Sequence, residues 1–443
     1  MKIQSLQIGG FRGVANMLSL NFGCNLTVLV GENGVGKTSV LDALAIMLDQ
    51  YVARYVRATP QRARQIKEAD VHIGFKLPGA FLRIEVETGQ ENLLEWSMSK
   101  QQRAEKLQGI VPSHFDDLNR YVRKKVEERG TSLAGEPLLV YYGQRRAVLD
   151  RSMSQRLREN ADLDASAASR AALDGNLDFR EFEAWFRDRS LLELQQRQDR
   201  RGYKDHQLDA VRQAITRSTG LTDPEYRMMP PRGLCVKKAV RRFPGNGKEP
   251  SDDPVLTILR VNQLSSGEKI FLATVGDLAR RLAVLNPDST DPLQGEGIVL
   301  IDEVELHLHP RWQRKFIPWL LETFPNCQFV VTTHSPQVLG EVEAAAIRVL
   351  RTSQDGFVES WTPDAAKGRD SNYILLHVLG AEERDGALKH ELDVLDDFIA
   401  DGRLEDAARA LVELRGKIEG SPPELTIAQA RLERRQRQQA QEG

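Results

Sequence analysis

The sequence predicts an α/β fold, and three apolar stretches with their flanking turns carry that prediction. Residues 26–30 (LTVLV) form a short β-branched run, and after a glycine-rich turn residues 39–52 show the apolar spacing of a helix. Two further runs, at 297–303 (GIVLIDE) and 328–334 (QFVVTTH), have the continuous apolar character of buried strands. A strand, a glycine loop and a helix in succession form the opening unit of an α/β nucleotide-binding domain.

Composition places the chain among globular proteins. Of its 443 residues, 41% are hydrophobic and 28% are charged, and the formal net charge is -2, which excludes global disorder and a polycation that coats nucleic acid. Cys24, Cys235 and Cys327 lack disulfide or zinc spacing and indicate a reducing compartment. No stretch resembles a signal peptide or a membrane span, so we expect a cytoplasmic protein that does not contact membranes.

We expect three regions along the chain. Residues 1–50 and 255–365 would form the two lobes of a nucleotide-binding head, and residues 366–443 a charged helical C-terminal region. Residues 51–254 would be an insertion whose strands complete the head and which carries a helical subdomain. The elements expected within that insertion are strands at 71–76, 81–87 and 138–142, a polar loop or lid at 150–178, a helical pair at 179–218 and a loop at 230–254.

The glycine-rich turn GENGVGKT, at 31–38, matches the phosphate-binding pattern G-x-x-x-x-G-K-[ST] in full. Its glycines let the backbone wrap around phosphates, Lys37 can bridge the β- and γ-phosphates, and Thr38 can hold Mg²⁺. An ordinary turn is the alternative, and the strand before and helix after the loop argue against it. The loop residues that we expect to contact the nucleotide are Asn33, Gly34, Val35, Gly36, Lys37, Thr38 and Ser39.

Polar side chains end the two later strands. GIVLIDE ends with Asp302 and Glu303, and two carboxylates beside a core are costly unless they meet a cation or a polarised water. We expect Asp302 to hold Mg²⁺ through water and Glu303 to activate the attacking water, with a surface turn as the alternative. His334 ends QFVVTTH, so it should lie at the same sheet edge and hydrogen-bond the γ-phosphate, unless it is a structural histidine. The candidate catalytic residues are thus Glu303, His334 and Lys37.

Four other residues are weaker candidates. Gln144 follows an apolar strand and could contact the Mg²⁺ shell, or be an exposed loop residue. Arg12 could reach phosphate oxygens or be a surface charge. His307 and His309 have the spacing of a metal pair on a strand, but no further ligand set is visible, and a polar loop beside the nucleotide is the better interpretation.

A second phosphate cradle precedes the helix expected at 268–285. In LSSGE, at 264–268, Ser265 and Gly267 stand where small residues expose N–H groups and the positive end of a helix dipole to an anion. With the phosphate loop, IVLIDE and TTH, this stretch resembles the signature of ABC-type ATPase heads. The phrase FRG near the N-terminus, together with DEVELHLHP, is similar to the SMC/RecF/OLD branch and unlike transporter ATPases.

The resemblance implies a P-loop ABC-ATPase head with a mixed or parallel sheet, flanking helices, a helical insertion and a helical C-terminal tail. In that family two heads enclose two ATP molecules, and the signature of one head caps the γ-phosphate bound by the other. It therefore implies ATP and Mg²⁺ as cofactors and a homodimer or higher homo-oligomer in which Ser265 and Gly267 contact the partner's nucleotide. The sequence departs from the common LSGGQ at Ser266 and Glu268.

The C-terminal region adds a narrower resemblance. GRDSNYILLHVLG at 368–380 and ALVELRGKI at 410–418 are similar to the stand-alone Septu-type anti-phage ATPases, which work with a separate HNH nuclease and also occur beside retrons. No DxD motif follows His334, so we expect the chain to regulate a nuclease and not to cut nucleic acid itself. The alternative is a RecF-like DNA-repair protein that binds nucleic acid through basic stretches at 121–125 (YVRKK) and 236–242 (VKKAVRR).

Overall fold

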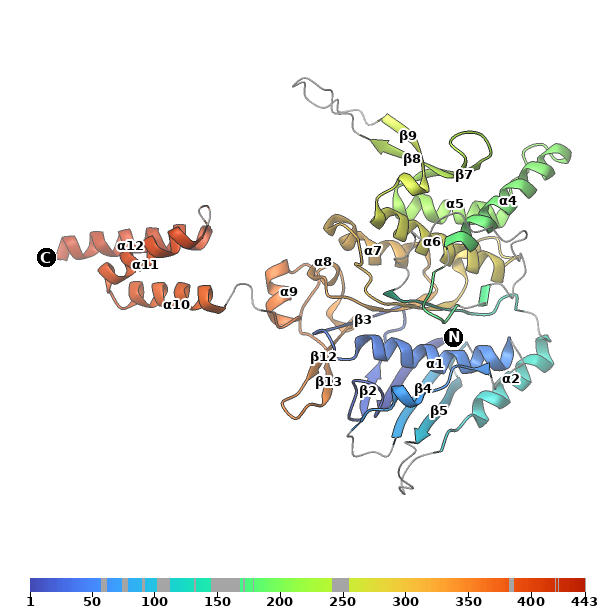
Figure 1. Cartoon of the computed structure of the whole chain (residues 1–443), viewed down its shortest axis with the longest axis horizontal. Coiled ribbons are helices and arrows are strands. Elements are labelled where there is room, and N and C mark those ends of the chain that lie inside the picture. The colour runs from blue at the N-terminus through green and yellow to red at the C-terminus, as the bar shows by residue number, and fades with distance from the viewer. Residues whose placement is uncertain are drawn as a thin grey trace. The chain divides into compact units, whose positions relative to one another are not determined.

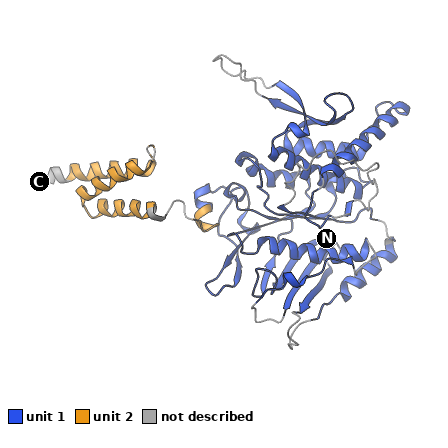
Figure 2. Ribbon diagram, in the orientation of Figure 1, with its two compact units in different colours: residues 1–374 blue, residues 375–443 orange. Residues whose placement is uncertain are grey.

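The chain forms two compact units, residues 1–374 and residues 375–443 (Figure 2). Within the described part of the chain, no helix is long and apolar enough to cross a bilayer. The polar segment expected at 150–178 falls mostly outside that part. The computed structural model describes residues 1–56, 62–73, 79–89, 92–101, 112–130, 133–144, 168–169, 172–177, 179–240, 255–381, 386–418, 420 and 422–442.

A six-stranded sheet forms the centre of unit 1, in the order β13–β12–β3–β11–β10–β6 (Figure 1). Strand β13 pairs antiparallel with β12, and every other neighbouring pair is parallel. Strands β6, β10 and β11 are buried along their whole length, as their apolar runs predict for a parallel sheet. This sheet confirms the predicted α/β fold. The strands are β3 (Leu26–Gly31), β6 (Leu138–Tyr142), β10 (Gly297–Ile301), β11 (Cys327–Thr332), β12 (Ile347–Thr352) and β13 (Val358–Trp361).

A second, antiparallel sheet has the order β2–β1–β4–β5. Its strand β4 contains the strand expected at 81–87. The strand expected at 71–76 does not form where the structure describes it: Val71 makes only an isolated bridge to Phe11, and residues 74–76 lie outside the described residues. The strands of this sheet are β1 (Lys2–Gly9), β2 (Leu18–Asn21), β4 (Gly79–Thr88) and β5 (Asn92–Gln101).

One buried side chain joins the two sheets. Gln328, in β11, accepts the Ile3 N–H at 2.7 Å and donates to the carbonyls of Ile3 and Gly23, both at 2.8 Å. A carboxamide in the middle of a buried strand would be costly without such partners. These three bonds therefore fix the antiparallel sheet to the central one.

Helix α1 (Lys37–Tyr55) lies between the two sheets (Figure 1) and contacts strands of both. It is buried around most of its circumference, as expected for a helix covered on both sides. The Trp96 indole donates to the Met47 carbonyl at 3.0 Å and so ties β5 to this helix. Helix α2 (Asp116–Arg129) packs beside α1 and β5.

Helices cover the other face of the central sheet, with α6 (Ser266–Leu285) innermost and almost entirely buried. Inside it, Asp277 pairs with Arg280 and Arg281, each at 2.7 Å, and accepts the Tyr142 hydroxyl at 2.9 Å. Burial works against this carboxylate, but the two arginines hold its pKa down to about 2. The other helices of unit 1 are α4 (Phe179–Asp199), α5 (His206–Thr219), α7 (Pro310–Thr323), α8 (Pro336–Leu339) and α9 (Ser371–His377), the last of which continues into residue 377 of unit 2.

A small antiparallel sheet precedes α6 in the chain, in the order β7–β8–β9. Its strands are β7 (Thr222–Arg227), β8 (Gly233–Val240) and β9 (Val255–Arg260). The prediction of a loop over 230–254 was therefore wrong for β8. Leu234, Cys235 and Val236 of that strand are buried, so packing overrides the flanking prolines and glycines. Short 3₁₀ turns occupy Glu68–Asp70, Val261–Gln263, Pro292–Gln294 and Ala344–Ala346.

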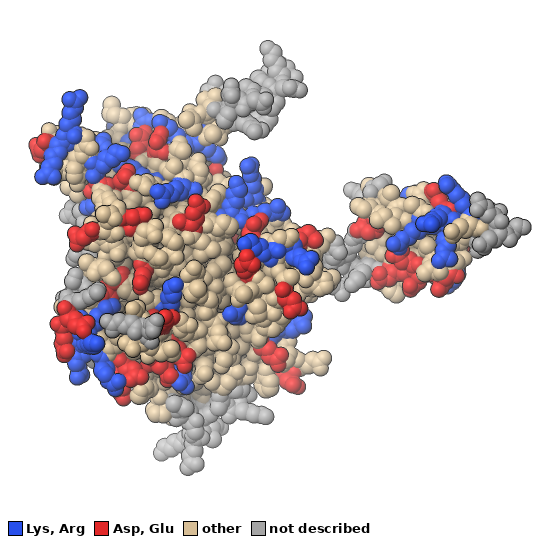
Figure 3. Space-filling view, turned by 180° about the vertical axis from the view of Figure 1, so that it is seen from behind, with Lys and Arg blue, Asp and Glu red and all other residues tan. Residues whose placement is uncertain are grey.

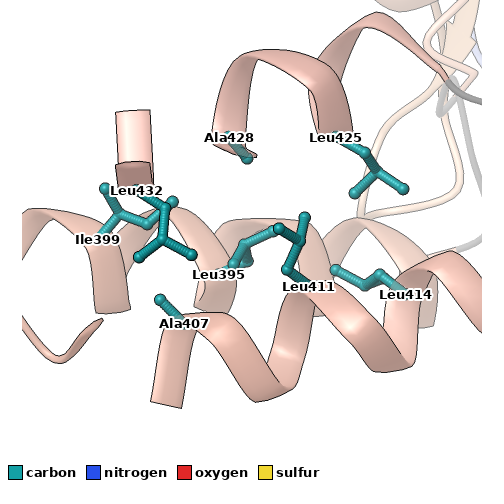
Figure 4. Close-up of a cluster of buried hydrophobic side chains, with 8 residues drawn as sticks. All are labelled: Leu395, Ile399, Ala407, Leu411, Leu414, Leu425, Ala428 and Leu432. Carbon is teal, nitrogen blue, oxygen red and sulfur yellow. The ribbon is translucent and has the colours of Figure 1, made fainter. Parts of the chain in front are cut away.

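Unit 2 consists of helices α10 (Gly386–Ala400), α11 (Leu404–Lys417) and α12 (Pro423–Glu442). They close around a core of their own (Figure 4). The region is charged and helical, as expected. The buried residues of this core are Leu395, Ile399, Ala407, Leu411, Leu414, Leu425, Ala428 and Leu432.

Candidate functional site

The phosphate loop connects β3 to α1 and closes tightly on the sheet. Gly31 has a φ of 144°, and a Cβ there would lie 2.2 Å from the Leu350 carbonyl oxygen, so no other residue fits. The Lys37 ammonium donates to the carbonyls of Gly31 and Glu32, both at 2.8 Å. The loop backbone therefore holds the lysine across the loop, and the N–H groups at the start of α1 form the anion-binding end of a helix.

Burial sets the acid–base chemistry of Lys37. Removal from water lowers the pKa of the ammonium to about 8, although the carboxylates of Asp302, Glu303 and Glu305 act in the opposite direction. An ammonium with a pKa of about 8 is mostly charged below pH 8, and burial leaves it only partly solvated. It is therefore available to an incoming phosphate.

The end of β10 brings a carboxylate to the start of α1. The Thr38 hydroxyl lies 3.0 Å from Asp302 Oδ2 and 3.3 Å from Oδ1. Asp302 is buried, and its Oδ1 also accepts the Thr332 hydroxyl at 2.6 Å. Hydroxyl and carboxylate oxygens are the ligands that Mg²⁺ takes in proteins, usually with phosphates and waters completing the shell. This pair fits a magnesium ion shared with a nucleotide.

Glu303 adopts a left-handed backbone conformation, with φ of 48°, which is uncommon for a residue other than glycine. Its N–H donates to Thr332 Oγ1 at 2.7 Å, and its Oε1 accepts Gln144 Nε2 at 3.0 Å. Gln144 follows β6, next to β10 in the sheet. Strained backbone held by surrounding bonds is typical of functional positions.

His334 follows β11 and is fixed through its backbone. Its N–H donates to Glu305 Oε1 at 2.5 Å, while Glu305 Oε2 accepts the Thr333 hydroxyl at 2.8 Å. Burial and the nearby Lys37 charge lower the pKa of the His334 ring. The imidazole is therefore neutral at pH 7 and can present one N–H donor.

These side chains line one cavity of about 180 Å³ at the carboxyl ends of the strands, where open α/β sheets bind ligands. Val35 of the loop is buried and does not line it. In the described residues, no group of three or more His, Cys, Asp or Glu could hold a metal by itself, which leaves His307 and His309 without a ligand set. The lining residues are Asn33, Gly34, Gly36, Lys37, Thr38, Ser39, Gln144, Asp302, Glu303 and His334.

Arg12 lies outside the cavity lining. Its guanidinium pairs with Asp42 of α1 and, at 2.9 Å, with Asp70. Its backbone has a φ of 49°. The phosphate contact expected of Arg12 stays a prediction.

Ser265 and Gly267 also lie outside the cavity of their own head. Ser265 is the N-cap of α6 and forms a capping box with Glu268, in which the serine hydroxyl accepts the Glu268 N–H at 3.4 Å and Glu268 Oε2 accepts the Ser265 N–H at 3.0 Å. The serine hydroxyl also donates to Glu268 Oε2 at 2.8 Å. A Cβ on Gly267 would lie 2.5 Å from the His307 carbonyl oxygen. The start of α6 is thus packed against the loop that follows Glu303.

Two residues of the site were missed from the sequence. Thr332 bonds both Asp302 and the backbone of Glu303, and Glu305 holds the turn that carries His334. The signal was present for Thr332, because a hydroxyl in the buried run FVVT needs polar partners. Glu305 lies in a loop, and its sequence gives no comparable signal.

Comparisons with known proteins find two family models and a set of solved structures that match parts of the chain. A family model described as an AAA domain matches residues 5–219, and one described as an AAA domain, putative AbiEii toxin, Type IV TA system, matches residues 154–340. Among solved structures, an SMC head domain from Thermotoga maritima covers 82% of this chain and 100% of its own, at 15% identity and a TM-score of 0.44.

Three relatives align over most of the chain. The Retron Vc95 probable ATPase of Vibrio cholerae serotype O1 biovar El Tor is 27% identical over 74% of this chain and 69% of its own length. The Retron Ec83 probable ATPase of Escherichia coli is 27% identical over 87% and 77%. The Septu protein PtuA of Bacillus thuringiensis is 25% identical over 79% and 74%. These relatives confirm the predicted resemblance.

Proposed function

We propose, from its homology to retron ATPases and Septu PtuA, that this protein binds ATP with Mg²⁺ and hydrolyses it between two heads. One observation carries the proposal. The cavity collects Lys37, the Thr38–Asp302 pair and Glu303, whereas Ser265 and Gly267 of the second phosphate cradle do not line it. One head therefore offers a nearly complete site that lacks the signature predicted to cap it.

Each side chain has a role in this scheme that its geometry supports. Lys37 would bind the β- and γ-phosphates, and Thr38 with Asp302 would hold Mg²⁺, which supplies charge neutralisation to the phosphates. Glu303, oriented by Gln144, would accept the proton of the attacking water. His334, neutral and fixed by Glu305, would donate to a γ-phosphate oxygen.

The proposed dimer follows from the position of the signature. A cap supplied by a second copy would make hydrolysis depend on association, and ATP would shift the equilibrium toward the dimer because only the dimer contacts it twice. The N-terminus of α6 suits an anion through the positive end of its dipole and the N–H groups of its first turn, of which the Glu268 N–H is capped by the Ser265 hydroxyl.

Glu303→Gln tests the scheme. We expect this variant to bind ATP, to lose most of its hydrolysis and to accumulate as a dimer, because a carboxamide keeps the Gln144 contact but cannot accept the proton. Sedimentation velocity with and without ATP measures the dimer. Adding Ser265→Arg should restore the monomer while ATP stays bound, and a Glu303→Gln protein that is monomeric at saturating ATP would contradict the proposal.

We further propose that the nucleotide state regulates a separate HNH-type nuclease in anti-phage defence. The support is the homology to Septu and retron ATPases and the lack of a nuclease motif after His334. Co-expression with the products of neighbouring genes, followed by purification with and without ATP, tests this. Failure of any nuclease to co-purify in either state would argue against it.

The RecF-like alternative gains little from the two basic stretches. Lys237 pairs with Asp223 at 2.8 Å, Lys238 with Glu268 at 2.6 Å, and Lys125 with Glu136 at 2.5 Å. Residues 241 and 242 lie outside the described residues. On the face of the head that Figure 3 shows, basic and acidic side chains are interspersed. Binding of nucleic acid stays a prediction, for which salt-dependent, ATP-dependent binding of duplex DNA is the test.

A further inference from the structure

The carboxylate of Glu268 stands in an unfavourable place for an anion-binding helix start. It occupies the third helical position of α6, where the common signature carries an uncharged glutamine. A negative side chain there stabilises the isolated helix through the dipole. It also offsets the attraction of the same N–H groups for a phosphate.

Lys238 supplies the missing positive charge. This lysine projects from β8, and its ammonium lies 2.6 Å from Glu268 Oε1. The glutamate side chain is 10% exposed, so its carboxylate is shielded from solvent, while the lysine side chain is 36% exposed. Charge-assisted bonds with little solvent around them are stronger than surface ion pairs.

The other carboxylate oxygen of Glu268 is engaged by the signature itself. Oε2 accepts the Ser265 N–H at 3.0 Å and the Ser265 hydroxyl at 2.8 Å. The partners on its two oxygens hold the pKa of Glu268 below its usual range, although burial alone would raise it. The glutamate is therefore an anion whose charge must be cancelled by a neighbour, and Lys238 is that neighbour.

We propose that Lys238 is a positioning residue of the ATP-dependent dimer: by neutralising Glu268, it allows the start of α6 to approach the triphosphate held by a second copy. Without Lys238, the carboxylate would repel the phosphates and would hold the Ser265 hydroxyl more tightly. The inference rests on the proposed function. It also assigns Lys238 to an ion pair within the chain, whereas the basic stretch at 236–242 had suggested a contact with nucleic acid.

The adjacent lysine offers a matched control. Lys237 lies on the same strand and also pairs with a carboxylate, Asp223, but it does not contact the signature. Changing either lysine to methionine removes one charge and one ion pair. Only Lys238→Met leaves the charge of Glu268 uncompensated.

The experiment measures the dimer dissociation constant at saturating ATP in the Glu303→Gln background by sedimentation velocity. We expect Lys238→Met to weaken the dimer roughly tenfold or more. Lys237→Met should stay within about twofold of the parent. In a protein that also carries Glu268→Gln, Lys238→Met should change the constant by no more than about twofold, because no charge remains to be cancelled.

The outcomes separate the two proposals. If the Glu303→Gln parent does not dimerise with ATP, the proposed function and this inference both fall. If the parent dimerises and Lys238→Met behaves like Lys237→Met, or weakens the dimer equally when Glu268→Gln is present, the inference alone is overturned. Should Lys238→Met fail to fold, as thermal unfolding would show, Lys238→Gln removes the same charge and replaces that variant in both backgrounds, with the same expected and contradicting results.

Discussion

Lys37 shows how one residue can set the pH range of the whole site. Its pKa of about 8 lies below the ordinary value of 10.5 because the ammonium is buried. A bound triphosphate would raise that pKa, since phosphate oxygens favour the charged form. Above pH 8 the binding of ATP must therefore be accompanied by uptake of a proton.

We predict that the dissociation constant for ATP is nearly constant from pH 7 to 8 and then rises by up to about tenfold per pH unit. Isothermal titration calorimetry in buffers of different ionisation enthalpy measures both the constant and the proton uptake. The arginine of Lys37→Arg keeps its charge throughout this range. We expect this variant to bind ATP more weakly than the wild type, but its dissociation constant should not rise between pH 8 and 10. A wild-type constant that is flat from pH 8 to 10 would refute the prediction.

The sequence predicts the residues that carry the chemistry of the site better than it predicts the residues that hold them in place. Lys37, Thr38, Asp302 and His334 lie together because parallel strands end at one sheet edge, and that rule can be applied to sequence alone. The bonds from Thr332 depend on the distance between neighbouring strand ends, which no spacing in the sequence reveals. Arg12 has two carboxylate partners that are distant along the chain, and only the fold brings them together.

At the scale of the helices and strands, the position of the start of α6 depends on one close backbone contact. The backbone at Gly267 lies against the His307 carbonyl, where a Cβ would come within 2.5 Å. The helix and the loop after Glu303 can therefore hold this spacing only with glycine. A change at this point would move the signature relative to that loop.

We predict that Gly267→Ala lowers the free energy of unfolding by about 1–3 kcal/mol and weakens the ATP-dependent dimer, while binding of ATP to one head is unchanged. Urea unfolding and sedimentation velocity measure the two effects. The control is Gly416→Ala in α11, where a Cβ meets nothing within 4 Å and the free energy of unfolding should rise by up to about 1 kcal/mol. Equal behaviour of the two variants would show that the contact with His307 is unimportant.

The predictions of helices and strands were correct where the apolar periodicity was strong. They were wrong where turn-forming residues in the local composition indicated a loop. The strand at 138–142 and the helix after the phosphate loop follow directly from apolar runs. Strand β8 has the buried run LCV but is flanked by Pro230, Pro231 and the glycines near residue 245, and these turn residues dominated the prediction. Its strand pairing with β7 and β9 is a tertiary fact that no local pattern contains.

At the scale of the whole molecule, the chain contains two independent cores. Unit 2 buries Leu414, at 1% exposure, within its own three helices, whereas Val412 on the same helix is 72% exposed. A unit with its own core should lose its structure without taking the head with it.

We predict that Leu414→Asp unfolds unit 2 but leaves ATP binding by the head unchanged, because an unpaired carboxylate cannot be accommodated in an apolar core. Circular dichroism should show loss of helix, and calorimetric titration with ATP should show an unchanged dissociation constant. Val412→Asp on the exposed face is the matched control and should change neither. Loss of ATP binding in Leu414→Asp alone would mean that the head requires the folded unit.

Gln328 gives the head a mechanical property. Its carboxamide forms hydrogen bonds with the N–H and carbonyl of Ile3 and with the carbonyl of Gly23. The antiparallel sheet therefore cannot slide past the central sheet without breaking these bonds. The same six-residue strand ends at Thr332, whose hydroxyl holds Asp302. The two ends of this buried strand therefore hold the antiparallel layer at Gln328 and the Asp302 carboxylate at Thr332.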